Sequence, residues 1–210
     1  SEQMKRWFEP ESRPRLFTDE ELLENPYLIC EFDQGDELEG PISISVMDRG
    51  LLPESSIASK HPIPKPSAID GELDPRRVRA VIVSILREAA KEGDTFLSQT
   101  ELIERISKAN LSHPCDISSD WLNGNISQFE GVVERFALPL SGTSKSVDGN
   151  SLQVLQLSEL KQQEDYLRKI INARAKKSVP STKADWETLI VETIKKRGLT
   201  FDANNKRHVE

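Results

Sequence analysis

A proline-rich stretch near residue 60 most strongly constrains how this chain can fold. Pro53, Pro62, Pro64 and Pro66 lie among serines and lysines in the run PESSIASKHPIPKPSAIDG. Proline lacks a backbone N–H and fixes φ, so four prolines at this spacing forbid helix and favour an extended, semi-stiff path. We therefore predict a linker over residues 53–72, a helical unit before it at 1–52, a larger unit at 73–177 and a helical tail at 178–210.

The first unit carries signals for two short helices. Thr18 is a plausible N-cap, because the acids at 19–21 that follow it suit the positive end of a helix dipole. A second short helix is expected from about Ser43 to Met47, with Gly50 as its C-terminal stop.

The larger unit reads as three helices followed by a β-hairpin. Asp74 and Pro75 open a helix that runs through Glu92, and a Ser98/Glu101 capping box opens the next. A third helix is expected over 119–126. Strands at 132–140 and 152–157 flank the loop SGTSKSVDGN, and a long helix follows from 158 to about 176. This order predicts a mainly α (α+β) chain with a winged-helix unit.

Charge is distributed unevenly along the chain. The net charge of −7 is made up of −10 over residues 1–75, −1 over 76–150 and +4 over 151–210. Acidic regions repel nucleic acid, whereas the C-terminal third can present a basic face to it.

The residues give no positive case for an active site. The nearest string to a phosphate-binding loop, at 142–146, lacks the second glycine and lies between two expected strands. His61, His113 and His208 are not spaced to share a metal. We therefore predict no catalytic residue, metal or cofactor in this segment. The chain lacks a signal peptide and a membrane-spanning apolar run, which favours a cytoplasmic location.

Cations cluster at several points that suit phosphate contact. The candidates are Arg76, Arg77, Arg79, Arg135, Lys145, Arg168, Lys169, Arg174, Lys176 and Lys177. Cations near the C-terminal end of a helix also compensate the helix dipole. Dipole compensation therefore remains an alternative explanation for the cations at 168–177. The third helix (SDWLNGNI) has no Arg or Lys, which argues against reading of bases through it.

The order of motifs resembles the N-terminal region of RecD-like superfamily-one helicases, the family of the exodeoxyribonuclease V alpha subunit. The segment EELLENPYLICE at 20–31 is similar to a family string that precedes helix-hairpin-helix repeats. The family's next motifs correspond to VMDRG at 46–50, then to Asp74, Arg77, Glu88, Ala89, Gly93, Thr95, Leu97, Glu101 and Leu102, and finally to the strand and long helix at 155–171. Gly40-Pro41 stands where the family has a glycine-rich hairpin.

This resemblance implies a non-catalytic accessory region of a DNA helicase. Its expected partners are single-stranded or forked DNA and an ATP-driven, magnesium-dependent motor located C-terminal to residue 210. The alternative is a winged-helix adaptor that binds a partner protein without direct DNA contact. The acidic N-terminal third and the lack of Arg and Lys in the third helix favour this alternative.

Overall fold

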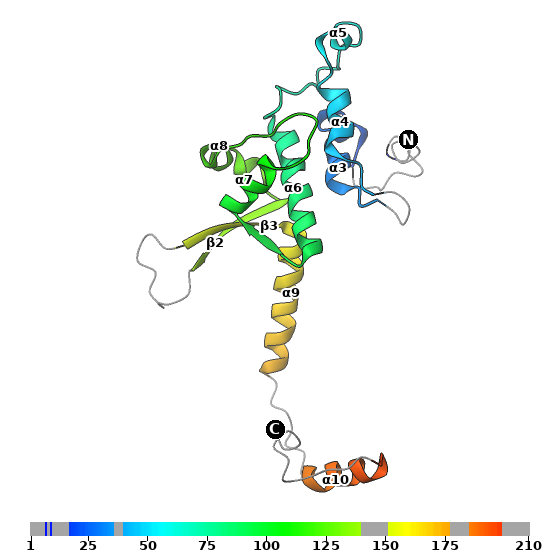
Figure 1. The fold of residues 1–210 in the computed structure, drawn as a ribbon, viewed down its shortest axis with the longest axis vertical. Coiled ribbons are helices and arrows are strands. Elements are labelled where there is room, and N and C mark those ends of the chain that lie inside the picture. Colours follow the sequence, from blue (N-terminus) through cyan, green and yellow to red (C-terminus); the bar gives the residue numbers. More distant parts are fainter. Residues whose placement is uncertain are drawn as a thin grey trace. The chain divides into compact units, whose positions relative to one another are not determined.

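Helices and one small antiparallel sheet give this chain an α+β fold (Figure 1). The computed structural model describes Trp7, Glu9 and residues 17–35, 40–139, 151–176 and 185–198. The chain divides into two compact units, Ser1–Tyr166 and Leu167–Glu210. The expected N-terminal helical unit and the start of the expected larger unit therefore belong to one compact unit, although a proline-rich stretch joins them.

The first unit holds most of the elements. In chain order these are α2 (Asp19–Glu24), α3 (Leu28–Phe32), α4 (Ile44–Leu51), α5 (Ser55–Ala58), α6 (Pro75–Glu92), β1 (Phe96–Ser98), α7 (Gln99–Ser107), α8 (Ser119–Asn125), the 3-10 turn η1 (Ile126–Phe129), β2 (Val133–Pro139) and β3 (Ser151–Leu157). Helix α9 (Ser158–Ala175) begins in the first unit and ends in the second, which also holds α10 (Trp186–Lys196).

The short N-terminal helices confirm one expected boundary and correct two others. Thr18 caps α2 in a complete capping box, because its hydroxyl accepts from the Glu21 amide while the Glu21 carboxylate accepts from the Thr18 amide. Helix α4 continues through Gly50 and ends one residue later, so Gly50 is not the predicted stop. One helical turn, α5, lies within the predicted linker. It ends before the closely spaced Pro62, Pro64 and Pro66, so these prolines do not interrupt it.

Helix α6 lies at the centre of the first unit (Figure 1). Its predicted start and end are confirmed: Asp74 accepts from the Arg76 amide, Pro75 takes the first position, and Gly93 ends the helix with a left-handed φ of 105°. Its buried face packs against α3 and α4 and against α7, β1 and β3. The fully or almost fully buried apolar residues of this face are Val78, Ala80, Val81, Ile82, Val83, Leu86 and Ala89.

The three strands pair in the order β1-β3-β2, and both pairings are antiparallel. Leu97 of β1 is paired with Leu155 of β3, and both side chains are buried in the core. Phe96 and Phe136 stand on the other face, where their rings meet edge to face at a centroid distance of 6.4 Å. Leu97 and Leu155 thus face the core, while Val154 and Gln156 on the opposite face of β3 are buried as well.

A search of the described ranges for a membrane-crossing element finds no helix with the required length and apolar character.

We predict that Leu102→Ala lowers the free energy of unfolding by about 2–5 kcal/mol. Leu102 of α7 is fully buried in the core cluster, so truncation removes buried methyl groups and leaves a cavity. Urea denaturation followed by circular dichroism measures the change. The matched control is Thr100→Ala on the exposed side of the same helix, where we expect a change within about 0.5 kcal/mol. Equal midpoints for the two variants would contradict this packing.

Candidate nucleic-acid interface

Arg77, predicted to contact phosphate, is enclosed in the first unit. Its side chain is fully buried and forms a bidentate ion pair with Asp48, at 2.9 Å from Nε to Oδ1 and 2.8 Å from Nη2 to Oδ2. Its Nη groups also donate to the carbonyl oxygens of Glu72 and His113, at 2.7 and 2.6 Å. The Tyr27 hydroxyl donates to the same Asp48 carboxylate at 2.8 Å. No surface of Arg77 faces solvent in this structure, which disfavours the predicted phosphate contact at this residue.

The charges in this network are matched inside the protein. Burial opposes ionisation of Arg77, but its hydrogen bonds to Asp48 and the charge of that carboxylate outweigh burial and raise the arginine's pKa. Burial, together with the hydrogen bond to Asp48, raises the pKa of Tyr27 and keeps the phenol protonated. The network therefore holds an arginine cation and a neutral tyrosine around one carboxylate.

Arg76 is engaged by the segment that leads into α6. Its guanidinium pairs with Asp74 at 2.9 Å and donates to the carbonyl oxygens of Glu24 and Ala68, both at 2.6 Å. Burial alone would raise the pKa of Asp74, but hydrogen bonds from the Arg76 side chain and from the amides of Asp70 and Arg76 lower it. Arg76 thus ties the loop before α6 to the N-terminal helices.

Arg79 pairs with a buried carboxylate. Its Nε donates to Oε1 of Glu31 at 2.9 Å, and Glu31 is 1% exposed. Burial raises the pKa of Glu31, although Arg79 partly offsets that effect. Within the described part of the chain, Oε2 of Glu31 has no hydrogen-bond partner. Arg79 is therefore committed to neutralising an internal charge.

The sequence itself carries a signal for the buried position of Arg77. Arg77 precedes Val81 by four residues, which places it on the same helical face as the apolar residues of α6. An arginine on a buried stripe needs an internal carboxylate. Asp48, which sequence analysis did not select as a functional residue, supplies it from α4.

The third helix and the hairpin offer little positive charge. Helix α8 carries no Arg or Lys and presents Asp120 in its first turn. Arg135 of β2 lies beside it, and its Nη1 donates to Oδ1 of Asn123 at 2.7 Å. Lys145, expected at the tip of the hairpin, lies outside the described residues.

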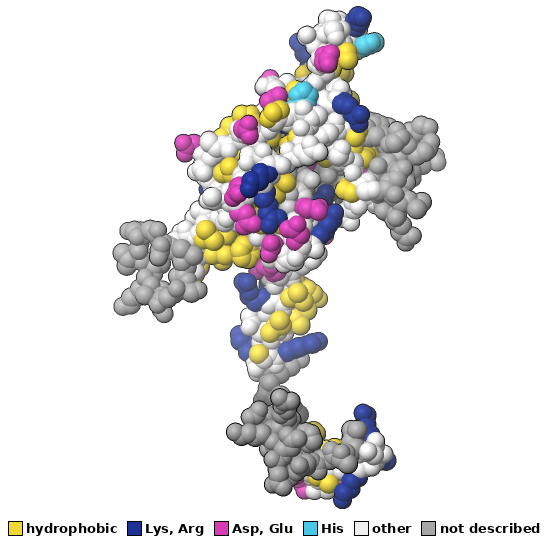
Figure 2. Space-filling model, viewed as in Figure 1, with side chains coloured by type: hydrophobic (Ala, Val, Ile, Leu, Met, Phe, Trp, Pro, Cys, Tyr) yellow, Lys and Arg dark blue, Asp and Glu magenta, His cyan; other side chains and the backbone are white. Residues whose placement is uncertain are grey.

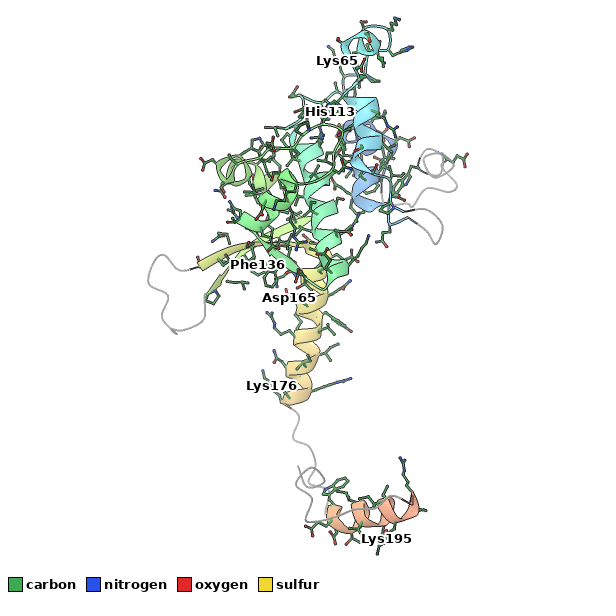
Figure 3. All side chains as sticks on the ribbon, in the orientation of Figure 1. Lys65, His113, Phe136, Asp165, Lys176 and Lys195 are labelled. Atoms are coloured by element: carbon green, nitrogen blue, oxygen red, sulfur yellow. The ribbon has the colours of Figure 1, made fainter. Side chains whose placement is uncertain are left out.

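The second unit carries the remaining predicted cations. Arg168, Lys169, Arg174 and Lys176 are exposed at the end of α9, and Lys177 lies outside the described residues. Helix α10 ends in three further exposed cations, Lys195, Lys196 and Arg197. In residues 167–176 and 185–198 together, seven bases face three acids. Dark blue side chains accordingly mark both helices in Figure 2, and Figure 3 labels Lys176 and Lys195.

The predicted lack of a metal site can be examined only where the structure describes the chain. In that part, no three His, Cys, Asp or Glu side chains gather in a way that would hold a metal ion. His113 Nδ1 lies 3.5 Å from a carboxylate oxygen of Glu72, and His61 is exposed. His208 lies outside the described residues.

Comparison with protein-family models, curated proteins and solved structures finds no match for this chain. The resemblance to RecD-like helicases therefore stays a prediction.

We predict that Asp48→Ala lowers the free energy of unfolding by about 3–5 kcal/mol, because it leaves the Arg77 charge buried without its partner. The double variant Asp48→Leu/Arg77→Met should recover much of this loss, since it removes both charges and keeps apolar volume. Chemical denaturation measures all three proteins. Glu104→Ala, which breaks an exposed pair with Lys108, is the control and should leave the midpoint nearly unchanged. A small effect of Asp48→Ala would contradict the role of this ion pair.

We predict that Asp74→Asn destabilises the protein at neutral pH but not in acid. Asparagine also caps helices well, so the substitution removes mainly the charge that holds Arg76. The lowered pKa of Asp74 means that its ionised form stabilises the fold above the unfolded-state pKa, and that this stability is lost as pH falls through the folded-state pKa. The difference from wild type should be about 1–3 kcal/mol at pH 7 and should shrink as the pH falls below the ordinary range of an aspartate pKa. A difference that is independent of pH would be the contrary result.

Proposed function

We propose that residues 73–177 form a winged-helix unit with a long C-terminal helix, and that the chain guides DNA for a RecD-like, ATP-driven helicase motor located C-terminal to residue 210. The order of elements supports the first part: helix, strand, helix, helix, and then two strands that close the antiparallel sheet β1-β3-β2. In this proposal the second unit contacts the DNA backbone, and the chain itself performs no chemistry.

The observation that carries the proposal is the different surroundings of the predicted DNA-contacting cations in the two units. Arg76, Arg77 and Arg79 are bound to internal carboxylates, whereas the cations of α9 and α10 in the second unit are exposed. Exposed cations near a phosphate chain release counterions on binding, which favours association without sequence preference. The absence of Arg and Lys from α8 supports contact with phosphates in preference to base edges.

The geometry around Gly40-Pro41 supports a packing role for the N-terminal helices. A helix-hairpin-helix binds phosphate through free amides at its hairpin. Here the amide of Ile42 donates to the Asp33 carboxylate at 2.7 Å, and Pro41 has no amide N–H to offer. We therefore propose that this degenerate, helix-hairpin-helix-like unit braces α6 and does not hold DNA.

A second candidate function is a winged-helix adaptor that binds a partner protein. Exposed apolar residues on α9 favour it: Tyr166 is 65% exposed, Leu167 56% and Ile171 62%. Side chains of this size at helical spacing suit the apolar face of a partner helix. In this alternative, removal of the neighbouring cations leaves partner binding largely intact.

We predict that the protein binds a fluorescently labelled forked oligonucleotide with a dissociation constant of about 10⁻⁶ to 10⁻⁴ M at physiological salt, and more tightly at low salt. Changing Arg168, Lys169, Arg174 and Lys176 to Gln should weaken binding at least about tenfold and flatten its salt dependence, because fewer counterions are released. Fluorescence anisotropy at several salt concentrations measures both effects.

The matched control for this experiment changes Lys60, Lys65, Lys91 and Lys108 to Gln. These four exposed lysines of the first unit alter the net charge by the same amount, so a specific role for the second unit requires that they affect binding much less. If the two sets of substitutions weaken DNA binding equally, binding depends on net charge alone and the second unit has no specific role. No binding at low salt would remove the DNA-guiding function and leave the adaptor.

A further inference from the structure

A cavity of about 510 Å³ lies in the first unit between α3, α4, α6 and the junction of β3 with α9. This volume falls within the range of small-molecule sites, which is about 300–1,000 Å³. None of the cations proposed to contact DNA lines the cavity. It is therefore a separate feature of the molecule.

Arg87 of α6 is the distinctive side chain in this cavity. Its Nη1 donates to the Cys30 carbonyl oxygen at 3.3 Å, and the described part of the chain supplies no second hydrogen bond to this guanidinium. Burial lowers the pKa of Arg87, and the charges of Glu159, Glu31 and Asp33 offset that effect only in part. An arginine has several N–H donors in one plane, so most of them are available to a bound acceptor.

The walls around Arg87 are mainly apolar. They are formed by side chains from four parts of the fold: Cys30, Pro41, Ile42, Ile44, Ala90, Leu157 and Leu160. Ile42 and Ile44 are 6% and 4% exposed, so they form fixed parts of the core surface. Such walls bind the apolar body of a ligand, and a small number of polar groups fix its orientation.

The other charges at the cavity limit what Arg87 can bind. Lys91 is paired with Glu88 at 3.4 Å on the exposed rim. Asp33 accepts from the Ile42 amide, and Glu159 also lines the cavity. With these carboxylates nearby, a phosphate dianion is repelled more strongly than a monoanion. A carboxylate also matches the planar fork of a guanidinium, with which it forms two parallel hydrogen bonds.

We propose that this cavity binds a small organic acid with one carboxylate and an apolar body, and that Arg87 holds the carboxylate. The walls cover the aliphatic or aromatic body. Ser43 and Ile44, at the start of α4, line the same space, and the Ser43 side chain makes no capping hydrogen bond, so this helix start also favours an anion.

Hexanoate is a suitable probe, and binding is measured on the full chain by calorimetry and by NMR. We expect hexanoate to shift the amide signals of Ile42, Ile44 and Leu157 selectively. Arg87→Gln should weaken hexanoate binding about tenfold or more, because it removes the charge-assisted pair. Arg105→Gln is the matched control: it removes an arginine that is paired on the surface at α7, and it should leave binding unchanged.

Two further ligands separate charge from apolar body. Hexanol has the body without the charge, and inorganic phosphate has charge without the body, so both should bind much more weakly than hexanoate. Equal binding of hexanol, displacement of hexanoate by phosphate, or an unchanged affinity of Arg87→Gln would overturn the proposal. If Arg87→Gln does not fold, the NMR shifts in the wild-type protein decide, since shifts confined to residues away from the cavity also overturn it.

Discussion

The ion pair between Arg77 and Asp48 joins the two halves of the first unit across the proline-rich stretch. A buried pair of this kind is tolerated only where its remaining hydrogen-bonding capacity is met. Here the Tyr27 hydroxyl donates a hydrogen bond to the Asp48 carboxylate, and the carbonyl oxygens of Glu72 and His113 accept hydrogen bonds from the Arg77 guanidinium. Because these groups come from the N-cap of α3, from α4, from α6 and from two loops, this network holds the N-terminal helices on the central helix, together with the contacts of Arg76 and Arg79. The extended linker therefore does not separate two domains.

Most of the local structure could be predicted from the sequence because its signals are local. The cap of α6 at Asp74 and its glycine stop at Gly93, like the hairpin strands, depend on residues adjacent in the chain. The sequence does not predict the interior position of Gly50 or the helical turn at 55–58, and since both positions are largely exposed, core packing does not account for them. The winged-helix assignment remains a proposal, because element order and strand order describe a topology and do not identify a family.

The candidate site was less predictable, because a count of charges does not reveal which are available. Arg76, Arg77 and Arg79 look in sequence like a basic cluster, yet each is paired with a carboxylate that is distant in sequence or precedes the helix. The apolar helical face that Arg77 shares is a sequence signal for one of them, whereas the carboxylates that bind all three are identified only by the tertiary contacts. The cations of the second unit differ from these arginines in exposure. Their side chains face solvent, so a phosphate chain can reach them.

Two arginines on α6 show how the number of acceptors decides the role of a cation. Arg77 meets a carboxylate and several carbonyl oxygens, so its donors are satisfied and the residue is structural. Arg87, further along the same helix, meets one carbonyl oxygen at a long distance beside a cavity. Partial burial without full pairing is costly for a charge, and a bound carboxylate would relieve that cost. The same residue type thus stabilises the fold at one end of the helix and leaves binding capacity at the other.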